Sequence, residues 1–303
     1  MTATIASTSF AAPVAGGLLA GGQWRPDAAG TPVLAVHGIT ASHRSWDVFA
    51  EGLPGRRVIA PDLRGRGRSN ALPAPYTLVQ HADDLVAVLD ALGVDRAHVV
   101  GHSMGAFVSV RLAERHPDRV AGLSLVDGGL PVPNPDGIAP EDLPAALLGP
   151  ALERLSMTFR TRADYVAFWR RHPALGPYWS EAIEEYVEYD VDGAEPDLRS
   201  SANAAAVAVN AVELDGSAGY TAALAALPGP IDVFRAPRGL LDAAPLYPDG
   251  LVGAWAERMP QLAVHEIPDV NHYTIVMSDR GAGSVIPVIR ARIEAAETQE
   301  GAS

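Results

Sequence analysis

The sequence is organised around the stretch Ala97-His98-Val99-Val100-Gly101-His102-Ser103-Met104-Gly105-Ala106. An apolar run ends here in Gly-x-Ser-x-Gly, and a helical pattern begins at once. This is the sequence form of a nucleophile elbow, in which a serine sits on a sharp turn from a strand into a helix. Gly101 and Gly105 lack a Cβ, so the strand and the helix can pass close together around Ser103. Since the pentapeptide also arises by chance, its context has to support it.

Apolar runs on both sides of this stretch alternate with helical patterns. The runs occupy residues 32–36, 57–60, 120–126, 231–234 and 262–267, and helices are predicted at 45–51, 77–92, 104–116, 249–258 and 284–297. Short apolar runs of this kind are typical of strands buried on both faces of a parallel sheet. The sequence therefore predicts an α/β fold with a doubly wound, mostly parallel sheet.

Residues 130–228 break this alternation. They open with a proline-rich loop, lack a clear buried strand and continue as helical segments rich in aromatic residues. We predict that they form a helical lid (cap) inserted into one core made of residues 1–129 and 229–303. Most of the aromatic side chains are expected to pack inside the lid, and those near Tyr178 and Trp179 to line an apolar pocket.

The composition excludes several kinds of chemistry and of partner. The chain of 303 residues has no cysteine, and all 23 basic residues are arginines, so thiol and lysine Schiff-base catalysis are unavailable. A net charge of −13 argues against nucleic acid or an anionic membrane as a partner. No apolar stretch is long enough for a membrane span, and the first residues lack the basic start of a secretory signal. We therefore expect a cytoplasmic protein.

Polar residues directly follow four of the predicted strands. They are His37, Asp62, Ser103 and Asp127. Because parallel strands end at the same edge of a sheet, these residues are expected to gather on one rim, where ligands of such folds bind.

The chain resembles the α/β-hydrolase superfamily of serine hydrolases over nearly its whole length. The matching segments are His37-Gly38, Pro61-Asp62-Leu63-Arg64-Gly65-Arg66-Gly67-Arg68-Ser69, Gly101-His102-Ser103-Met104-Gly105 and Asn271-His272. The resemblance implies that Ser103 is the nucleophile and His272 the base, because the family order places the histidine last. It also implies an oxyanion hole made by the backbone amides of Ile39 and Met104.

The resemblance also suggests roles for three other polar residues of these segments. His37 is expected to be structural and His102 to be a packing residue. Asp62 is expected to organise the arginine-rich loop that follows it.

The family also carries an acid that orients the histidine, and here the sequence departs from the commonest pattern. That pattern places an aspartate shortly after the strand at 231–234. Gly239 occupies that position, and Asp242 comes three residues later. Asp127 instead ends the strand beside that of Ser103, where a subset of the superfamily carries its acid. Because parallel neighbours lie about 4.8 Å apart, a carboxylate there can reach the same imidazole. We favour Asp127 as the orienting acid and keep Asp242 as the alternative.

These residues predict a serine hydrolase that cleaves a carboxylic ester or lactone of a hydrophobic small molecule, without a cofactor or a metal. Carbon–carbon bond hydrolases and cofactor-free oxygenases or perhydrolases also use a serine and a histidine, so they stay open as alternatives. Ser103 excludes the dehalogenases and epoxide hydrolases that use aspartate as nucleophile. A non-catalytic ligand-binding protein is less favoured, because Ser103 and His272 are both in place.

Overall fold

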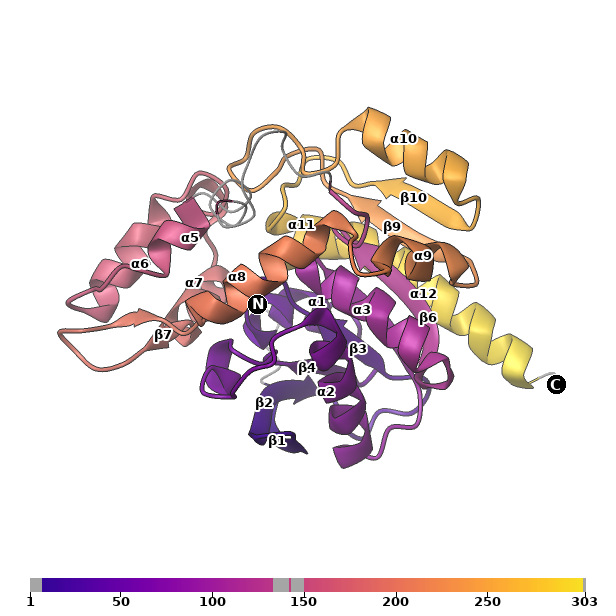
Figure 1. Ribbon diagram of the computed structural model, residues 1–303, viewed down its shortest axis with the longest axis horizontal. Helices are drawn as coiled ribbons and strands as arrows, with labels where there is room; N and C mark the ends of the chain where they lie inside the picture. Colours follow the sequence, from indigo (N-terminus) through magenta and orange to yellow (C-terminus); the bar gives the residue numbers. More distant parts are fainter. Residues whose placement is uncertain (1–6, 133–141, 143–149, 302–303) are drawn as a thin grey trace.

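An eight-stranded sheet forms the centre of the molecule in the computed structural model, which describes residues 7–132, 142 and 150–301 (Figure 1). The strand order is β1-β2-β4-β3-β5-β6-β9-β10. The strands are β1 (Thr8–Val14), β2 (Gly17–Trp24), β3 (Val33–Val36), β4 (Val58–Pro61), β5 (Ala97–His102), β6 (Val120–Val126), β9 (Ile231–Arg235) and β10 (Leu262–Glu266). From β4 to β10 every pair is parallel, and β1 and β2 add an antiparallel edge. The predicted α/β fold with a mostly parallel sheet is confirmed.

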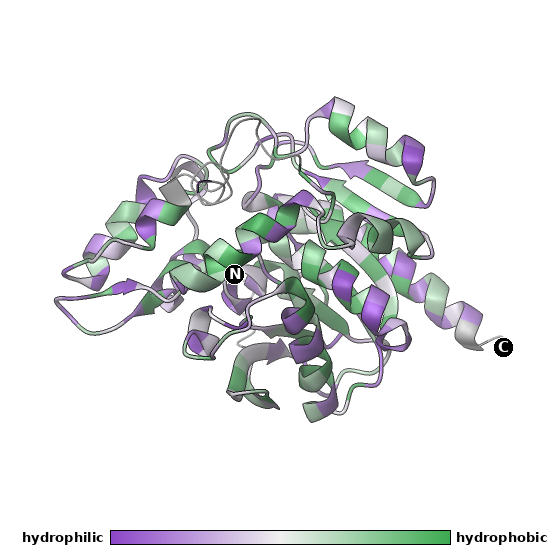
Figure 2. Cartoon of the chain, in the orientation of Figure 1, coloured by the Kyte–Doolittle hydropathy of each residue, from purple (hydrophilic) through white to green (hydrophobic). Residues whose placement is uncertain are grey.

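Helices cover both faces of this sheet. Buried side chains of α2 (Leu78–Ala91), α3 (Met104–Arg115) and α10 (Asp249–Arg258) pack in one apolar cluster. Those of α1 (Asp47–Glu51), α11 (Thr274–Met277) and α12 (Asp279–Gly301) pack in a second. The helices are apolar toward the sheet and polar toward solvent (Figure 2), as amphipathic helices on a buried sheet must be. In the described part of the chain, no helix has both the length and the apolar character needed to cross a bilayer.

The segment between β6 and β9 leaves the sheet. It contains α5 (Pro150–Arg154), α6 (Arg162–Arg170), α7 (Glu181–Tyr189), α8 (Ala204–Val212) and α9 (Tyr220–Ala226). Three of these helices begin at a side chain that caps the first turn: Thr161, Ser180 and Asn203 each accept a hydrogen bond from a backbone N–H two or three residues later. Helices α5 to α7 project to one side of the sheet (Figure 1).

Three local predictions differ from the structure. No strand was predicted at residues 8–14, but these residues form one, which pairs along its whole length with β2. The inserted segment contains a two-stranded ladder, β7 (Val191–Asp192) and β8 (Arg199–Ser200). The closing helix begins at Asp279, five residues before the predicted start at Ser284. These short or alanine-rich segments lack the periodic apolar pattern on which such predictions depend.

Gly105 allows the first turn of α3 to lie against the end of β3. A Cβ at this position would lie 2.1 Å from the Val36 carbonyl oxygen. This oxygen belongs to the backbone and cannot rotate away, so the helix would have to move away from the sheet to relieve the clash.

Gly105→Ala should therefore lower the free energy of unfolding by about 3 kcal/mol, the upper range for an overpacked core. Chemical denaturation measures this change. Gly253→Ala is a matched control inside α10, where a new Cβ meets nothing within 4 Å. It should raise the free energy of unfolding by about 0.5–1 kcal/mol. A similar response of the two variants would contradict the packing described here.

Candidate active site

Ser103 stands at the turn between β5 and α3 with a backbone conformation that L residues rarely adopt. Its φ is 55° and its ψ is −125°. The Ser103 amide donates to the Val126 carbonyl at 2.9 Å, and the Ser103 carbonyl accepts from the Ala106 amide at 3.0 Å. These bonds tie the turn to β6 and to the first turn of α3. A non-glycine residue held at positive φ by its surroundings is typical of a functional site.

His272 and Asp127 meet beside this turn. Nδ1 of His272 donates to Oδ2 of Asp127 at 2.7 Å, and both side chains are buried. The other carboxylate oxygen of Asp127 accepts from the Ala236 amide at 3.1 Å. Asp127 follows β6 directly, and its own amide donates to the Phe234 carbonyl of β9 at 2.7 Å. The carboxylate is therefore fixed by the sheet, and it fixes the imidazole tautomer with Nε2 free of hydrogen.

Asp242, the alternative acid, does not contact His272. Its carboxylate accepts from Arg238 Nε at 2.8 Å, from Asn271 Nδ2 at 2.9 Å and from the Tyr178 hydroxyl at 3.1 Å. Asn271 immediately precedes His272, and Tyr178 belongs to the inserted segment. Asp242 thus joins the histidine loop to the insertion, a role that the sequence did not indicate.

His102 lies beside His272 and holds its backbone. Its Nε2 donates to the His272 carbonyl oxygen at 2.7 Å, and the two imidazole rings lie 4.7 Å apart. Burial lowers the pKa of His102 well below its usual value, so the ring stays neutral. The sequence suggested only a packing role. The structure adds a hydrogen bond that holds the backbone of the residue expected to be the base.

The two amides expected to form the oxyanion hole lie beside Ser103. Ile39 follows β3, Met104 opens α3, and both line the same cavity as Ser103. The Met104 amide has no acceptor within α3 because it belongs to the first turn. Within the described ranges, neither amide donates to a protein acceptor.

His37 contacts the peptide group that carries the Ile39 amide. Its Nδ1 donates to the Gly38 carbonyl at 2.8 Å, and its Nε2 accepts from the Leu63 amide at 2.9 Å. Burial lowers its pKa to about 4, so it is neutral near pH 7. Donation to the Gly38 carbonyl polarises the peptide and makes its N–H a stronger donor.

Arg66 holds the other side of the same loop. The side chain is fully buried, and its Nε donates to the Ile39 carbonyl at 2.9 Å. Its other nitrogens donate to the Arg64 carbonyl at 3.0 Å and to Oδ1 of Asn210 in α8 at 2.7 Å. No carboxylate among the described residues pairs with this guanidinium. An unpaired buried cation is costly, and here it lies against the loop of a candidate oxyanion hole.

Asp62 organises the arginine-rich loop that follows it, as predicted from the sequence. One carboxylate oxygen accepts from the amide and from Nδ1 of His43, at 2.8 and 2.9 Å. The other accepts from the Arg68 amide at 2.9 Å and from the Tyr189 hydroxyl at 2.7 Å. Since Tyr189 belongs to α7, this contact also joins the inserted segment to the core.

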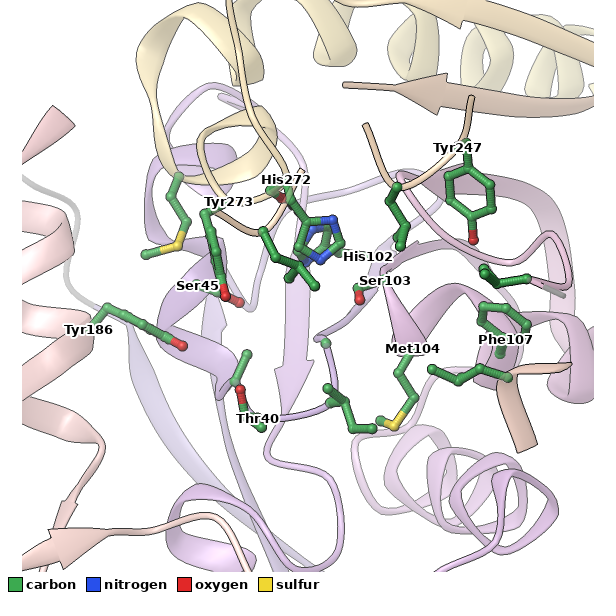
Figure 3. A pocket seen from close by; sticks show the side chains of 18 residues that line it. Thr40, Ser45, His102, Ser103, Met104, Phe107, Tyr186, Tyr247, His272 and Tyr273 are labelled. Atoms are coloured by element: carbon green, nitrogen blue, oxygen red, sulfur yellow. Dashed lines mark hydrogen bonds between the residues drawn. The ribbon is translucent and has the colours of Figure 1, made fainter. Parts of the chain in front are cut away.

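Ser103 and His272 open into a cavity of about 80 Å³ (Figure 3). The core and the inserted segment both contribute to its wall. Its lining is mostly apolar and includes Phe107, Val132, Leu214, Leu240, Leu246 and Met277. Tyr178 and Trp179, which were expected near a pocket of this kind, do not line this cavity. Among the described residues, no group of three or more histidines and carboxylates has the arrangement of a metal site.

Curated relatives match this chain over about a third of its length. "Putative carbamate hydrolase RutD" of Caulobacter vibrioides is 46% identical over 98 residues, which are 32% of this chain and 36% of that protein. Lipase LipV of Mycobacterium tuberculosis is 44% identical over 95 residues, 31% of this chain and 36% of the lipase. The match thus spans little more than a third of each relative.

Solved structures match nearly the whole chain. A thermophilic esterase from Thermogutta terrifontis, with malate bound, is 26% identical and covers 95% of this chain and 99% of its own, with a TM-score of 0.65. E-2-(acetamidomethylene)succinate hydrolase is 23% identical over 94% of this chain and 97% of its own, with a TM-score of 0.73. The family model for the alpha/beta hydrolase fold matches residues 31–276. The chain therefore belongs to the α/β-hydrolase family.

Proposed function

We propose that this protein is a serine hydrolase that cleaves a carboxylic ester or a lactone of a hydrophobic small molecule. The observation that supports it most directly is the 2.7 Å hydrogen bond from His272 to Asp127, on the cavity where Ser103 stands in its strained conformation. The mostly apolar wall of this cavity supports a hydrophobic substrate.

In this mechanism Ser103 Oγ attacks the carbonyl carbon while its proton passes to Nε2 of His272. Asp127 holds Nδ1–H and stabilises the imidazolium that forms. The tetrahedral intermediate collapses, and the alcohol leaves with the proton from His272. Water then gives a proton to His272 and attacks the acyl-enzyme. The acyl–oxygen bond breaks, the acid is released, and His272 returns the proton to Ser103 Oγ.

The oxyanion would accept from the amides of Ile39 and Met104. Arg66 and His37 support this role from behind, because each donates to a carbonyl of the loop that carries the Ile39 amide. The uncompensated charge of Arg66 adds a positive potential that favours the anionic intermediate over the neutral substrate.

We also infer that residues 130–228 act as a lid over the site. Three of their residues, Val132, Tyr186 and Leu214, line the cavity of Ser103. Asp242 and Asp62 each accept a hydrogen bond from a tyrosine of this segment. These contacts hold the segment against the rim of the core.

Carbamate hydrolysis is a second candidate, because relatives named for that reaction share 46% identity over 98 residues with this chain. Carbon–carbon bond cleavage and cofactor-free oxygenase or perhydrolase chemistry remain the wider alternatives, since they need the same serine and histidine. An ester and its isosteric carbamate, assayed side by side, distinguish the two hydrolytic reactions.

A fluorophosphonate probe should label the wild-type protein and fail to label Ser103→Ala, because only an activated serine attacks phosphorus at a useful rate. Intact-protein mass spectrometry measures the adduct. Ser156→Ala, at an exposed serine in the inserted segment, is the matched control and should label like the wild type. Absence of labelling in folded wild-type protein would sink the proposal.

Asp127→Asn should reduce kcat for a simple ester by about 10⁴-fold, because the amide favours the wrong tautomer of His272. Asp242→Asn should reduce it by less than about 10-fold, since this side chain holds the loop and not the imidazole. Steady-state kinetics on both variants decide between the acids. The reverse order of effects would assign the acid to Asp242.

Arg66→Met should reduce kcat by about 10-fold with little change in KM. Loss of one direct oxyanion donor costs about 100-fold, and indirect support is expected to cost less. Arg66→Lys keeps the charge and should recover part of the loss. Arg68→Met, at an exposed arginine of the same loop, is the control and should retain wild-type kcat. If Arg66→Met folds and keeps full kcat, the charge has no part in catalysis.

A further inference from the structure

The cavity beside Ser103 has two chemically different sides (Figure 3). Phe107 and Tyr247 lie on one side of the Ser103–His272 pair, and the Tyr247 hydroxyl is already used, because it donates to the Leu130 carbonyl at 3.0 Å. Four hydroxyl-bearing side chains lie on the opposite side: Thr40, Ser45, Tyr186 and Tyr273. We call this set the hydroxyl side.

The hydroxyl side is assembled from separate parts of the fold. Thr40 follows the Ile39 loop, and Ser45 belongs to the 3₁₀-helix His43–Trp46. Tyr186 comes from α7 of the inserted segment, and Tyr273 directly follows His272. Three elements distant in sequence therefore place hydroxyl groups in one half of the cavity.

The two tyrosines hold unused hydrogen-bond donors. Tyr186 is 2% exposed and Tyr273 is partly buried, yet neither hydroxyl makes a hydrogen bond to any residue in the described ranges. Burial raises the pKa of both phenols, that of Tyr273 to about 12, so each keeps its proton near neutral pH. Buried hydroxyl groups are normally paired, and those that face a cavity find their partner in what fills it.

The two smaller hydroxyl groups complete this half. Ser45 Oγ donates to the Ser42 carbonyl at 2.9 Å, so it offers only lone pairs to the cavity. Thr40 makes no side-chain hydrogen bond to another described residue. Thr40, Tyr186 and Tyr273 therefore each keep an O–H donor for the cavity, which suits a ligand group with an acceptor oxygen.

The residues that line the cavity also limit the charge that a ligand group on the hydroxyl side can carry. No arginine of the described chain lines the cavity, and His102 is held neutral. Arg154 lies behind Tyr186 in the inserted segment, but it is already paired with Asp190. A carboxylate on the hydroxyl side would lose its hydration without contacting a cation, because Arg66 is bonded to the Ile39 carbonyl and is not among the lining residues, and this loss is costly. A neutral carbonyl oxygen needs only the hydroxyl donors.

We propose that the hydroxyl side is a specificity subsite for a neutral carbonyl group, so that the substrate is an ester with a ketone, amide or second ester near the scissile bond. The remaining part of the substrate is apolar and lies toward Phe107 and Tyr247. This inference rests on the proposed serine-hydrolase function and defines its substrate class.

Two sets of shape-matched esters test the subsite on either side of the scissile bond. Ethyl levulinate, ethyl isocaproate and monoethyl succinate place a ketone, a branched alkyl group or a carboxylate in the acyl part. Acetonyl acetate, isobutyl acetate and O-acetylglycolate do the same in the alcohol part. Acid release gives kcat/KM for each ester with the wild type, Tyr186→Phe and Tyr273→Phe.

In one of the two sets, the ratio of kcat/KM for the ketone ester to that for the alkyl ester should fall about 10-fold in each tyrosine variant, the cost of one lost hydrogen bond. Intrinsic ester reactivity cancels, because the same two esters are compared on every protein. Tyr76→Phe is the control: its hydroxyl donates to the Leu72 carbonyl outside the cavity, and the ratio should not change. Thr40→Val supplies an isosteric third variant if either tyrosine variant fails to fold.

Two results would overturn the subsite. One is an unchanged ratio in both sets for folded tyrosine variants. The other is a preference for the carboxylate ester that the tyrosine variants lose, which would assign the site to anions. Failure of the proposed function itself looks different, because wild-type protein would then neither take up fluorophosphonate nor hydrolyse any of the six esters.

Discussion

Close contact between backbones, without side chains between them, is the constraint on which the site depends. A Cβ at Gly105 would lie 2.1 Å from the Val36 carbonyl oxygen, and one at Gly101 would lie 2.4 Å from that of Gly105. At Gly128 it would lie 2.2 Å from the Ser103 carbonyl oxygen. These approaches bring β3, β5, β6 and the start of α3 together at one point. The positive φ of Ser103 is stable only because the surrounding backbone leaves it no alternative.

The polar groups around this point form two connected sets. One runs from His102 through the His272 backbone and its imidazole to Asp127, and it fixes the position of that imidazole. The other joins His37 and Arg66 to the loop of Ile39. Arg66 extends this second set to Asn210 in the inserted segment. Both sets are buried, so their hydrogen bonds act in a medium that screens charge weakly.

The sequence predicted the strands best where apolar runs are continuous, and it predicted Ser103 and Asp127 as neighbours because strand ends share one edge. His272 was added by the resemblance to the α/β-hydrolase superfamily. It did not predict β1, whose alanine-rich composition carries no periodic signal. The roles of Arg66 and Asp242 were also missed. Each depends on a partner more than 25 residues away, Ile39 and Asn271, and no local pattern encodes such a pairing. The hydroxyl side of the cavity was missed for the same reason.

The location of Asp127 has a consequence for how this chain can diverge. Asp127 follows β6, the strand beside that of Ser103, and backbone groups of Phe234 and Ala236 anchor it at the end of β9. The carboxylate that pairs with His272 thus lies outside the loop that follows β9. Its residues Leu240 and Leu246 line the cavity, and it is joined to the histidine loop through Asp242 and a β-bridge between Arg238 and Asn271. The wall of the cavity can therefore change in this loop, by evolution or by design, while Ser103, His272 and Asp127 keep their positions.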